Sequence, residues 1–399
     1  MRASIVNSFL AHRQHLLPIA RCPNVVQVTR DVVALHATDP VGPYLSLWAR
    51  TTGFRREALK DALYERRELA KVLCMRDTLH VVPSDEIPFF FQAYASRRTS
   101  AERATVSALL VQAGMCTKGE AEKILERLQY QVLDVLHGKG PSTVRQIGQA
   151  VPELQARVRY GVDKPYGGKF SIGSRLVPSM CALGLLIRAR PRGTWRSNLY
   201  EYASLSAWLP GFDLETVAPQ EAQVWLVRRY LSTFGPVTRD DVQWWTGFSK
   251  GDTGEALRAL GAGVVEVAIE GWGSGHLMLA DDAERLRKFV TPDTPYAFFL
   301  PGLDPFIMGY KDRRRFLAAE HRAKVFDRAG NAVPTVWANG RVVGGWGQRK
   351  DGSVTYGLFG PVSDEERAVL EDKRQHLEGF LDGDLLRPRS RTAFTRALK

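Results

Sequence analysis

Two stretches, VLDVLHGKGPSTVRQI at residues 132–147 and VRRYLSTFGPVTRDDV at residues 227–242, carry one pattern at an offset of 95 residues. In both stretches, apolar residues at helical spacing lead to a Gly-Pro pair, and a threonine follows two residues later, at Thr143 and Thr238. A threonine in that position predicts the N-cap of a short second helix. Self-similarity at a fixed offset is the signature of a repeated structural module.

The residues after the second copy complete a recognisable order of elements. Periodicity and turn residues predict a helix that stops at Gly247, a helix over 252–260, and strands over 264–270 and 276–280 around a glycine-rich turn. A helix, a capped helix, a further helix and a hairpin in this order form a winged helix-turn-helix. The second copy therefore predicts a DNA-binding module.

The residues after the first copy follow the same order. A helix over 174–183 and strands over 185–189 and 199–203 are predicted, and the strands are separated by the loop Arg190-Pro-Arg-Gly-Thr-Trp-Arg196. A basic hairpin loop with an aromatic residue suits contact with DNA phosphates or the minor groove. We therefore predict that this loop is the wing of another module. The alternative is a solvated hairpin whose tryptophan turns to the core.

The first 115 residues are expected to form a module of the same kind. A helix is predicted over 29–38, because a proline two residues later disfavours its continuation, and another helix over 55–69. Period-two alternation over 73–82 predicts a half-exposed strand, which presents Arg76 and His80 on one face.

Strands and turns dominate the sequence from residue 296 onward. Asn339–Gly340 predicts a hairpin, because this pair supplies the positive φ angles of a type I′ turn. A strand over 353–359, a helix over 363–381 and a loose, solvated basic tail over 387–399 are also expected. The predicted fold is α+β, with three tandem winged helix-turn-helix motifs and a C-terminal small β-barrel. The predicted domains cover residues 1–115, 116–215, 216–292 and 293–399.

Composition limits the classes of function. With 55 Lys and Arg against 43 Asp and Glu, the formal net charge is +12, which favours a nucleic-acid partner because phosphate neutralisation drives such binding. The four cysteines are far apart in sequence, so we expect no metal, no disulfide framework and no cofactor. No apolar run approaches the roughly 18 residues of a membrane span, and residues 1–20 lack the core of a signal peptide. We therefore expect a cytoplasmic protein without a membrane partner.

Basic and aromatic residues on the expected strands and loops are the predicted DNA-binding residues. The segment 311–315 fits a solvated charged loop and a phosphate contact equally well. Trp244 and Trp245 cannot share a helix face, so we expect one in the core and the other partly exposed. The predicted DNA-binding residues are Arg76, His80, Arg188, Arg190, Arg192, Trp195, Arg196, Lys311 and Arg341.

The run Leu35-His-Ala-Thr-Asp-Pro40 holds the candidate catalytic residues. On a regular helix His36 and Thr38 do not face each other, but at a frayed, proline-terminated helix end they could converge on one water. His36 would then accept a proton from that water while Thr38 orients it. The structural alternative is a histidine that interacts with the dipole at a helix C-terminus.

Three motifs resemble one known family. Leu35–Pro40, Tyr44-Leu-Ser-Leu-Trp-Ala-Arg50 and Met75-Arg-Asp-Thr-Leu-His80 are similar to segments of the bacterial winged-helix DNA glycosylases that unhook interstrand crosslinks, the AlkZ/YcaQ-like family. The resemblance covers nearly the whole chain. It continues through Gly235–Pro236, Trp244-Trp-Thr-Gly247, Asp304–Pro305 and Val343–Gly344.

The resemblance implies a monofunctional DNA glycosylase that removes N7-alkylguanine adducts, crosslinks included, from double-stranded DNA, sometimes as self-resistance to an alkylating natural product. The Gln-apolar-Gln or Gln-apolar-Asp triplet that places the water in that family falls on His36, Ala37 and Thr38, so both polar positions differ. The triplet contains no lysine, so no lyase step is expected. Arg76 and His80 would support the site or grip phosphate, and three modules in one chain make a monomer sufficient.

Two alternatives stay open at this point. A protein with this scaffold and an altered triplet could bind DNA without catalysis, as a lesion sensor or a transcription regulator. RNA binding is the weaker alternative, because the sequence carries no RRM or KH signature. Excision of an alkylated base would separate the enzyme from both.

Overall fold

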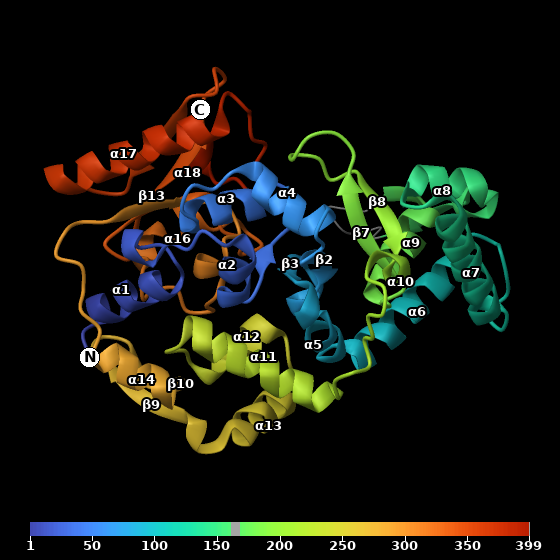
Figure 1. The fold of residues 1–399 in the computed structure, drawn as a ribbon, viewed down its shortest axis with the longest axis horizontal. Helices are drawn as coiled ribbons and strands as arrows, with labels where there is room; N and C mark the ends of the chain where they lie inside the picture. The colour runs from blue at the N-terminus through green and yellow to red at the C-terminus, as the bar shows by residue number, and fades with distance from the viewer. Residues whose placement is uncertain (161–167, 399) are drawn as a thin grey trace. The chain divides into compact units, whose positions relative to one another are not determined.

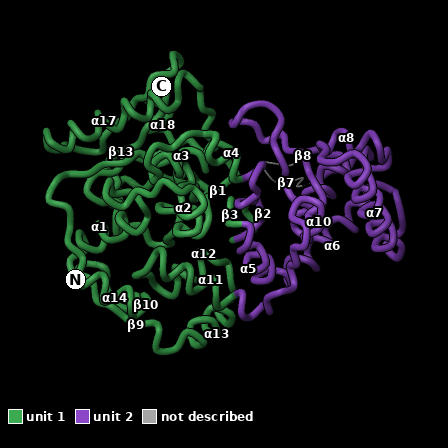
Figure 2. The backbone as a smooth tube through the Cα atoms, in the orientation of Figure 1, with its two compact units in different colours: residues 1–62, 75–83, 223–399 green, residues 63–74, 84–222 purple. Residues whose placement is uncertain are grey.

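The computed structural model describes residues 1–160 and 168–398, and the chain divides into two compact units (Figures 1 and 2). Unit 1 comprises residues 1–62, 75–83 and 223–399, and unit 2 comprises residues 63–74 and 84–222. Unit 1 is thus built from three separate stretches of chain. The finer division into four modules stays a prediction.

Unit 2 is mainly helical, with short antiparallel strands. β4, β8 and β7 form a three-stranded sheet in that order, and β5 pairs with β6. Its helices are α5 (Ile87–Gln92), α6 (Ala95–Gln112), α7 (Ala121–Lys139), α8 (Val144–Ala150), α9 (Gly173–Ala182) and α10 (Leu205–Trp208). Its strands are β2 (Leu69–Leu73), β4 (Ser142–Thr143), β5 (Arg157–Tyr160), β6 (Gly168–Ser171), β7 (Leu186–Pro191) and β8 (Tyr200–Ser204).

Unit 1 combines helices with paired antiparallel strands, and α4 and α11 run across the boundaries with unit 2. Its helices are α1 (Ala3–Arg13), α2 (Val25–Asp31), α3 (Gly42–Arg50), α4 (Arg56–Tyr64), α11 (Pro219–Phe234), α12 (Arg239–Thr246), α13 (Lys250–Leu260), α14 (Ala280–Arg287), α15 (Pro305–Met308), α16 (Arg322–Val325), α17 (Asp364–Leu381) and α18 (Ala393–Arg396). Its strands are β1 (Leu35–His36), β3 (Leu79–Pro83), β9 (Val264–Ile269), β10 (Gly273–Leu279), β11 (Ala297–Leu300), β12 (Thr335–Ala338), β13 (Arg341–Gln348) and β14 (Val354–Leu358).

The helix that follows the Gly-Pro pair starts in the same way in both copies of the repeated sequence. The Thr143 hydroxyl accepts a hydrogen bond from the Gln146 amide at 3.3 Å, and the Thr238 hydroxyl accepts one from the Asp241 amide at 3.1 Å. The side chains of Gln146 and Asp241 bond back to the cap residues, so a complete capping box starts α8 and α12. Both predicted N-caps are confirmed. After the second copy come α13 and the antiparallel hairpin β9–β10, and after the first copy come the paired strands β5 and β6, then α9 and the antiparallel hairpin β7–β8.

The C-terminal part of unit 1 contains an antiparallel sheet in the order β11-β12-β13-β14. Asn339 (φ 48°) and Gly340 (φ 74°) join β12 to β13 with positive φ at both positions, as the type I′ prediction requires. α17 begins at the capping box of Ser363 and packs against β11 and β14. In the part of the chain that the structure describes, β11 and β14 are the edges of an open sheet. The predicted closed barrel is therefore not confirmed.

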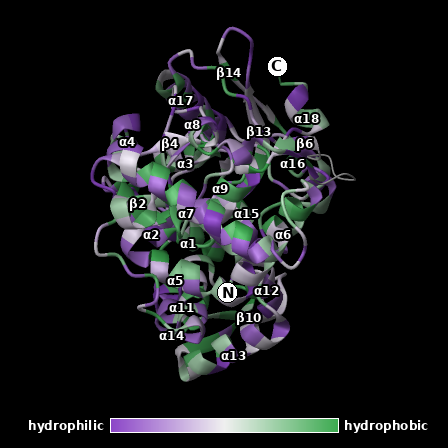
Figure 3. Cartoon of the chain, turned by 90° about the vertical axis from the view of Figure 1, so that its right-hand side faces the viewer, coloured by the Kyte–Doolittle hydropathy of each residue, from purple (hydrophilic) through white to green (hydrophobic). Residues whose placement is uncertain are grey.

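An aromatic cluster fills the core beneath this sheet. The fully buried Trp337 has ring-centroid distances of 4.9 Å to Phe306, 5.0 Å to Phe316 and 5.4 Å to Phe298. Aromatic pairs at these separations add to the stability gained from burial. Figure 3 shows hydrophobic and hydrophilic residues side by side on many helices, as expected where one face covers a core.

The predicted helix over 29–38 is wrong. The helix is α2, which starts earlier because the Asn24 side chain caps it by accepting hydrogen bonds from the amides of Val26 and Gln27. It ends at Asp31, and Val33 has φ 68°, a left-handed conformation that no helix continues through. The next residues are therefore extended, and they form strand β1.

The predicted strand over 73–82 and the predicted helix over 55–69 are also corrected. Arg76 (φ 54°) and Asp77 (φ 55°) are left-handed and break the strand into β2 and β3. His80 lies in β3 and Arg76 in the turn, so the two side chains do not share a strand face. The helix ends at Tyr64, and Arg67 (φ 57°) is again left-handed.

The predicted solvated tail over 387–399 is ordered in its described part. The Thr392 side chain caps α18 and its hydroxyl donates to the Lys324 carbonyl at 2.8 Å. Ser390, Thr392 and Thr395 are buried, because this segment packs on the rest of unit 1. No helix among the described residues is long and apolar enough to cross a membrane.

Candidate functional site

The candidate catalytic histidine lies on a short strand beside a second histidine. β1 pairs antiparallel with β3 so that Leu35 lies opposite Val81 and His36 opposite His80. The two imidazole rings have a centroid distance of 5.0 Å and an interplanar angle of 63°. The structure therefore joins two residues that sequence reasoning had assigned to different roles, His36 to catalysis and His80 to DNA.

Both histidines are neutral at neutral pH. Burial lowers the pKa of His36 well below its usual range, and the neighbouring His80 and Arg76 act in the same direction. Burial also lowers the pKa of His80 to about 4, although the Thr78 carbonyl, 3.0 Å from its Nδ1, opposes this shift. A neutral imidazole offers one donor and one acceptor, so each ring is suited to binding a water molecule.

The tautomer of His36 follows from its contact with Thr38. The Thr38 backbone amide donates to His36 Nδ1 at 3.4 Å. Because Nδ1 accepts this bond, the proton of the neutral ring lies on Nε2. In this form His36 gives a hydrogen bond from Nε2 and does not accept a proton there.

A cavity of about 30 Å³ lies against both histidines. That volume exceeds the roughly 10–15 Å³ that one water molecule needs, so the cavity can hold water. The residues that line it are Ala34, His36, Met75, Arg76, Thr78, His80, Phe234, Trp245, Leu303, Pro305 and Met308. Thr38 is not among them, so within the described residues the expected convergence of the His36 and Thr38 side chains on this cavity is not seen.

α3 holds the triplet from the other side. An ideal Cβ built on Gly42, the first residue of α3, would lie 2.9 Å from the His36 carbonyl oxygen. Only glycine allows this approach without a shift of the backbone. Gly42 therefore contributes to the position of His36, a role that the sequence pattern did not indicate.

Arg76 contacts the partly exposed tryptophan of the predicted pair. Its guanidinium carbon lies 4.3 Å from the centre of the Trp244 ring, and that of Arg313 lies 4.9 Å from the same ring. Trp245 is buried and stacks on Tyr230 at 4.7 Å, so the prediction of one core and one partly exposed tryptophan is confirmed. Burial lowers the pKa of Arg313 to about 10. Two cations on one ring make this a basic patch close to His36.

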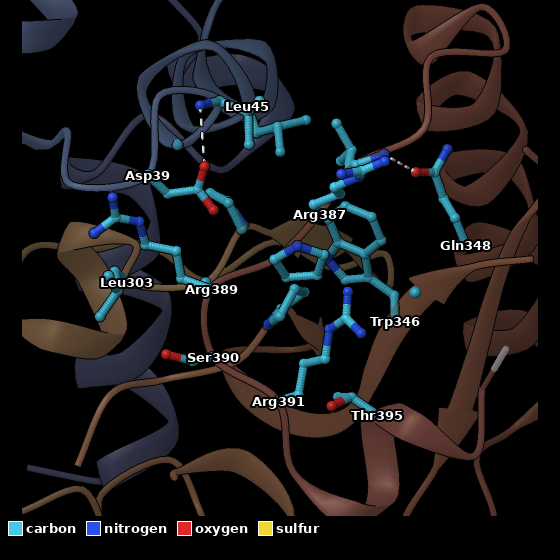
Figure 4. A pocket seen from close by; sticks show the side chains of 18 of the residues that line it. Asp39, Leu45, Leu303, Trp346, Gln348, Arg387, Arg389, Ser390, Arg391 and Thr395 are labelled. Carbon is cyan, nitrogen blue, oxygen red and sulfur yellow. Dashed lines mark hydrogen bonds between the residues drawn. The ribbon is translucent and has the colours of Figure 1, made fainter. Parts of the chain in front are cut away.

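A larger cavity, of about 490 Å³, lies on the Asp39 side of the triplet within unit 1 (Figure 4). Burial raises the pKa of the Asp39 carboxyl, although the Val41 amide and the guanidinium of Arg389 act in the opposite direction. The Val41 amide donates to Asp39 Oδ1 at 3.3 Å. Neither Asp39 nor Arg389 was predicted as a site residue. Asp39 belongs to the Leu35–Pro40 motif, but nothing in the sequence of the tail marked Arg389 as a site residue.

The predicted DNA-binding residues of unit 1 differ in their surroundings. Lys311 is exposed and its ammonium lies 2.7 Å from Asp240 Oδ2. Arg341, at the start of β13, is exposed. Arg76 and His80 lie against the small cavity. Of these, Arg76 and His80 are the residues that the structure brings next to His36.

The predicted wing residues belong to unit 2. Arg190 forms an ion pair with Glu65, and Arg192 forms one with Glu201 at 2.9 Å. Arg188 lies over the Tyr202 ring at 6.0 Å. Trp195 is half-buried and Arg196 is exposed. Their contact with DNA stays a prediction.

The comparisons with known proteins agree with one another. The family model described as DNA glycosylase AlkZ-like matches residues 29–380. An interstrand DNA cross-link repair glycosylase of Streptomyces sahachiroi is 28% identical over 302 residues, which are 73% of this chain and 75% of that protein. The solved structure of the Streptomyces sahachiroi DNA glycosylase AlkZ has a TM-score of 0.70 at 20% identity, over 98% of this chain and 99% of that one. At that identity the structural match shows a shared mixed helix-and-sheet fold.

Proposed function

The chain belongs to the AlkZ-like DNA glycosylase family, and from this premise we propose that it hydrolyses the N-glycosidic bond of N7-alkylguanine adducts in duplex DNA. The name of the Streptomyces sahachiroi relative supports including interstrand crosslinks among the substrates. The net charge of +12 supports duplex DNA as the partner. The proposed product is an abasic site in an uncut strand, because the triplet offers no amine for a Schiff base.

The proposed reaction needs little acid catalysis. An N7-alkylguanine is already cationic, so it leaves as a neutral base when the C1′–N9 bond breaks and its electron pair moves to N9. The sugar is then a cation, which a water oxygen attacks at C1′. That water loses its proton to solvent and needs no strong base, because its target is electron-deficient. The protein must therefore hold the lesion, stabilise the sugar cation and place one water.

One observation carries this proposal: a cavity that can hold water lies against two neutral imidazoles at the triplet. A cationic histidine there would repel the developing sugar cation, whereas a neutral one does not. We therefore assign placement of the water to His36. The Thr38 amide fixes the ring of His36 through Nδ1, so Thr38 acts as a positioning residue.

The tautomer refines the expected role of His36. With its proton on Nε2, His36 donates a hydrogen bond to the oxygen of the water and leaves a lone pair of that oxygen free for attack. The rate of base release should then stay level from pH 8 to pH 6, because burial lowers the pKa of His36 well below its usual value of about 6.5. A general base with an ordinary histidine pKa would instead lose activity as the pH falls through 6.5.

We propose that the helix–hairpin segments around α9 and α13 act as winged helix-turn-helix motifs that bind the duplex. Their capping boxes and paired strands support this reading. A single chain carries these segments, which supports a monomer as the active form.

The direct test is release of N7-methylguanine from duplex DNA by wild type, His36→Ala and the matched control His376→Ala. His376 lies on α17 with 65% of its side chain exposed, so its removal should leave release unchanged. We expect wild-type release, a loss of at least a hundredfold in His36→Ala, and strand cleavage only after alkali. Tight binding of damaged DNA by wild type without release would overturn the proposal and favour a non-catalytic lesion sensor.

A further inference from the structure

The cavity of about 490 Å³ is well formed and has a size typical of small-molecule sites. It lies in unit 1 between the start of α3, strand β13 and the extended segment 385–391 (Figure 4). Trp346 on β13 forms part of its wall, and its indole Nε1 donates to the Leu300 carbonyl at 2.8 Å. That bond fixes the large aromatic ring, so the wall exists before a ligand arrives.

The body of the cavity is apolar. Leu45, Leu303, Leu385 and Leu386 line it together with Trp346. Leu385 is 44% exposed, so this part of the wall is open to solvent. The leucines can bury apolar ligand surface, and an aromatic group of the ligand can stack on the indole ring of Trp346. The walls therefore predict a ligand with a largely apolar, flat body.

The rim of the cavity is strongly basic. All three arginines of the run Arg387-Pro-Arg-Ser-Arg391 line the cavity (Figure 4), and Arg349 and Lys350 line it as well. The segment is fixed by the Leu386 amide, which donates to Gln348 Oε1 at 2.9 Å. Asp39 is the single acid among the described residues that line this cavity. Five cations against one carboxylate favour hydrogen-bond acceptors or an anion on the ligand.

The cavity and the His36 site share one wall. Leu303 lines both the 490 Å³ cavity and the 30 Å³ cavity. It has φ 61°, a conformation that leucine rarely adopts and that persists only where neighbours enforce it. Here the following residue, Asp304, is held by the buried Arg50, and the Leu303 amide donates to the Ala332 carbonyl at 3.1 Å. Leu303, held in this conformation, thus contributes to the walls of both the small and the large cavity.

We propose that this cavity binds the bulky substituent of the adduct, a flat apolar group with acceptor or anionic atoms at its edge. This inference rests on the proposed function, because it names the substrate class of the same site. Charge decides which part of the adduct enters. The alkylated guanine is cationic and is repelled by the five cations, whereas its substituent is not. The guanine therefore stays outside this cavity, at the His36 triplet.

The first test compares two N7 adducts with the same kind of glycosidic bond, N7-methylguanine and N7-(naphthylmethyl)guanine, in one duplex. Leu385→Trp fills the cavity from a half-exposed position, so the fold should accept it, which a thermal melt checks. Val290→Trp, on a residue that is 82% exposed, is the matched control. We expect Leu385→Trp to lower the ratio of bulky to methyl release at least tenfold and Val290→Trp to leave it unchanged. An unchanged ratio in Leu385→Trp overturns the inference.

A second test does not depend on catalysis. We expect wild type and Val290→Trp to bind one molecule of 8-anilinonaphthalene-1-sulfonate, and Leu385→Trp to bind it at least tenfold more weakly by calorimetry. Arg391→Gln should weaken the sulfonate and leave neutral 2-naphthalenemethanol unchanged. If no adduct is released but these binding differences hold, the cavity assignment stands and the glycosylase proposal fails. If bases are released but neither variant changes binding, the cavity assignment fails alone.

Discussion

Arg50 and Asp304 form an ion pair that is completely removed from water. Arg50 Nη2 lies 2.7 Å from Asp304 Oδ1 and Arg50 Nη1 lies 2.8 Å from Oδ2, and neither side chain is exposed. The Ser46 hydroxyl donates to the same carboxylate at 2.7 Å. The pair ties α3, which follows the His36 triplet, to the start of α15, which follows Leu303. It therefore stabilises both sides of the candidate site at once.

Loss of one partner in this pair should be costly. Arg50→Met leaves the Asp304 carboxylate buried without a cation, and we expect the free energy of unfolding to fall by about 3–5 kcal/mol. The control is Arg66→Met, because the Arg66–Glu68 pair is exposed (51% and 47%) and should contribute no more than about 1 kcal/mol. Urea denaturation measures both. Equal effects in the two variants would show that burial does not set the strength of the Arg50 pair.

Acid should destabilise the fold through His80. In the unfolded chain this histidine binds a proton below about pH 6.5, whereas its pKa in the folded protein is about 4. Between these values the unfolded state holds more protons, so the free energy of unfolding falls as the pH falls through this window. We expect His80→Asn to reduce the difference in stability between pH 7 and pH 5. The exposed His376→Asn should not reduce it, and an equal reduction in both would contradict the assignment.

Lys71 in unit 2 should produce a second window, on the alkaline side, in which stability also rises with pH. It is fully buried, its ammonium donates to the Tyr64 hydroxyl at 2.9 Å, and burial lowers its pKa to about 7. The unfolded chain keeps this proton until about pH 10.4, so the free energy of unfolding rises with pH between about 7 and 10. Lys71→Met should remove that rise, and the exposed Lys60→Met should keep it. The free energy of unfolding, measured by denaturation at pH 7 and pH 9.5, shows whether each variant keeps the rise.

The affinity for DNA should depend more on Arg341 than on Arg314, which is also an exposed arginine. The Arg314 guanidinium lies 2.6 Å from Asp312 Oδ2, so this pair carries no net charge. Arg341 is exposed on β13, and if it neutralises one phosphate, Arg341→Gln should weaken binding and reduce the slope of log affinity against log salt by about one. Arg314→Gln is the control. Equal slopes in wild type and Arg341→Gln would remove Arg341 from the predicted interface.

The features that the sequence predicted well are local. The N-caps at Thr143 and Thr238 and the turn at Asn339 depend on hydrogen bonds and φ angles within three or four residues. Such features need no knowledge of the rest of the fold. The extent of a helix is less local, and α2 differs from its prediction because Asn24 rather than Thr29 is the cap.

The candidate site depends on contacts that no short window contains. His36 is extended because β1 pairs with β3, more than 40 residues later, and Val33 leaves the helical region to allow it. The charged tail looked solvated because its neighbours in sequence are polar, yet Arg389 faces a cavity whose other walls come from α3 and β13. Tertiary contacts decide these positions, and local propensity does not.

Because unit 1 is built from three separate stretches of chain, its parts leave the ribosome at different times. Residues 63–74 and 84–222 emerge before most of unit 1, so unit 2 can fold while the protein is still being made. The strand that carries His36 emerges early, but the walls of its cavity at Trp245, Leu303 and Met308 come from the last half of the chain. A nascent or prematurely terminated chain therefore holds its candidate catalytic histidine without the residues that enclose it. Under the proposed function, the site is complete only once the chain has been translated past Met308.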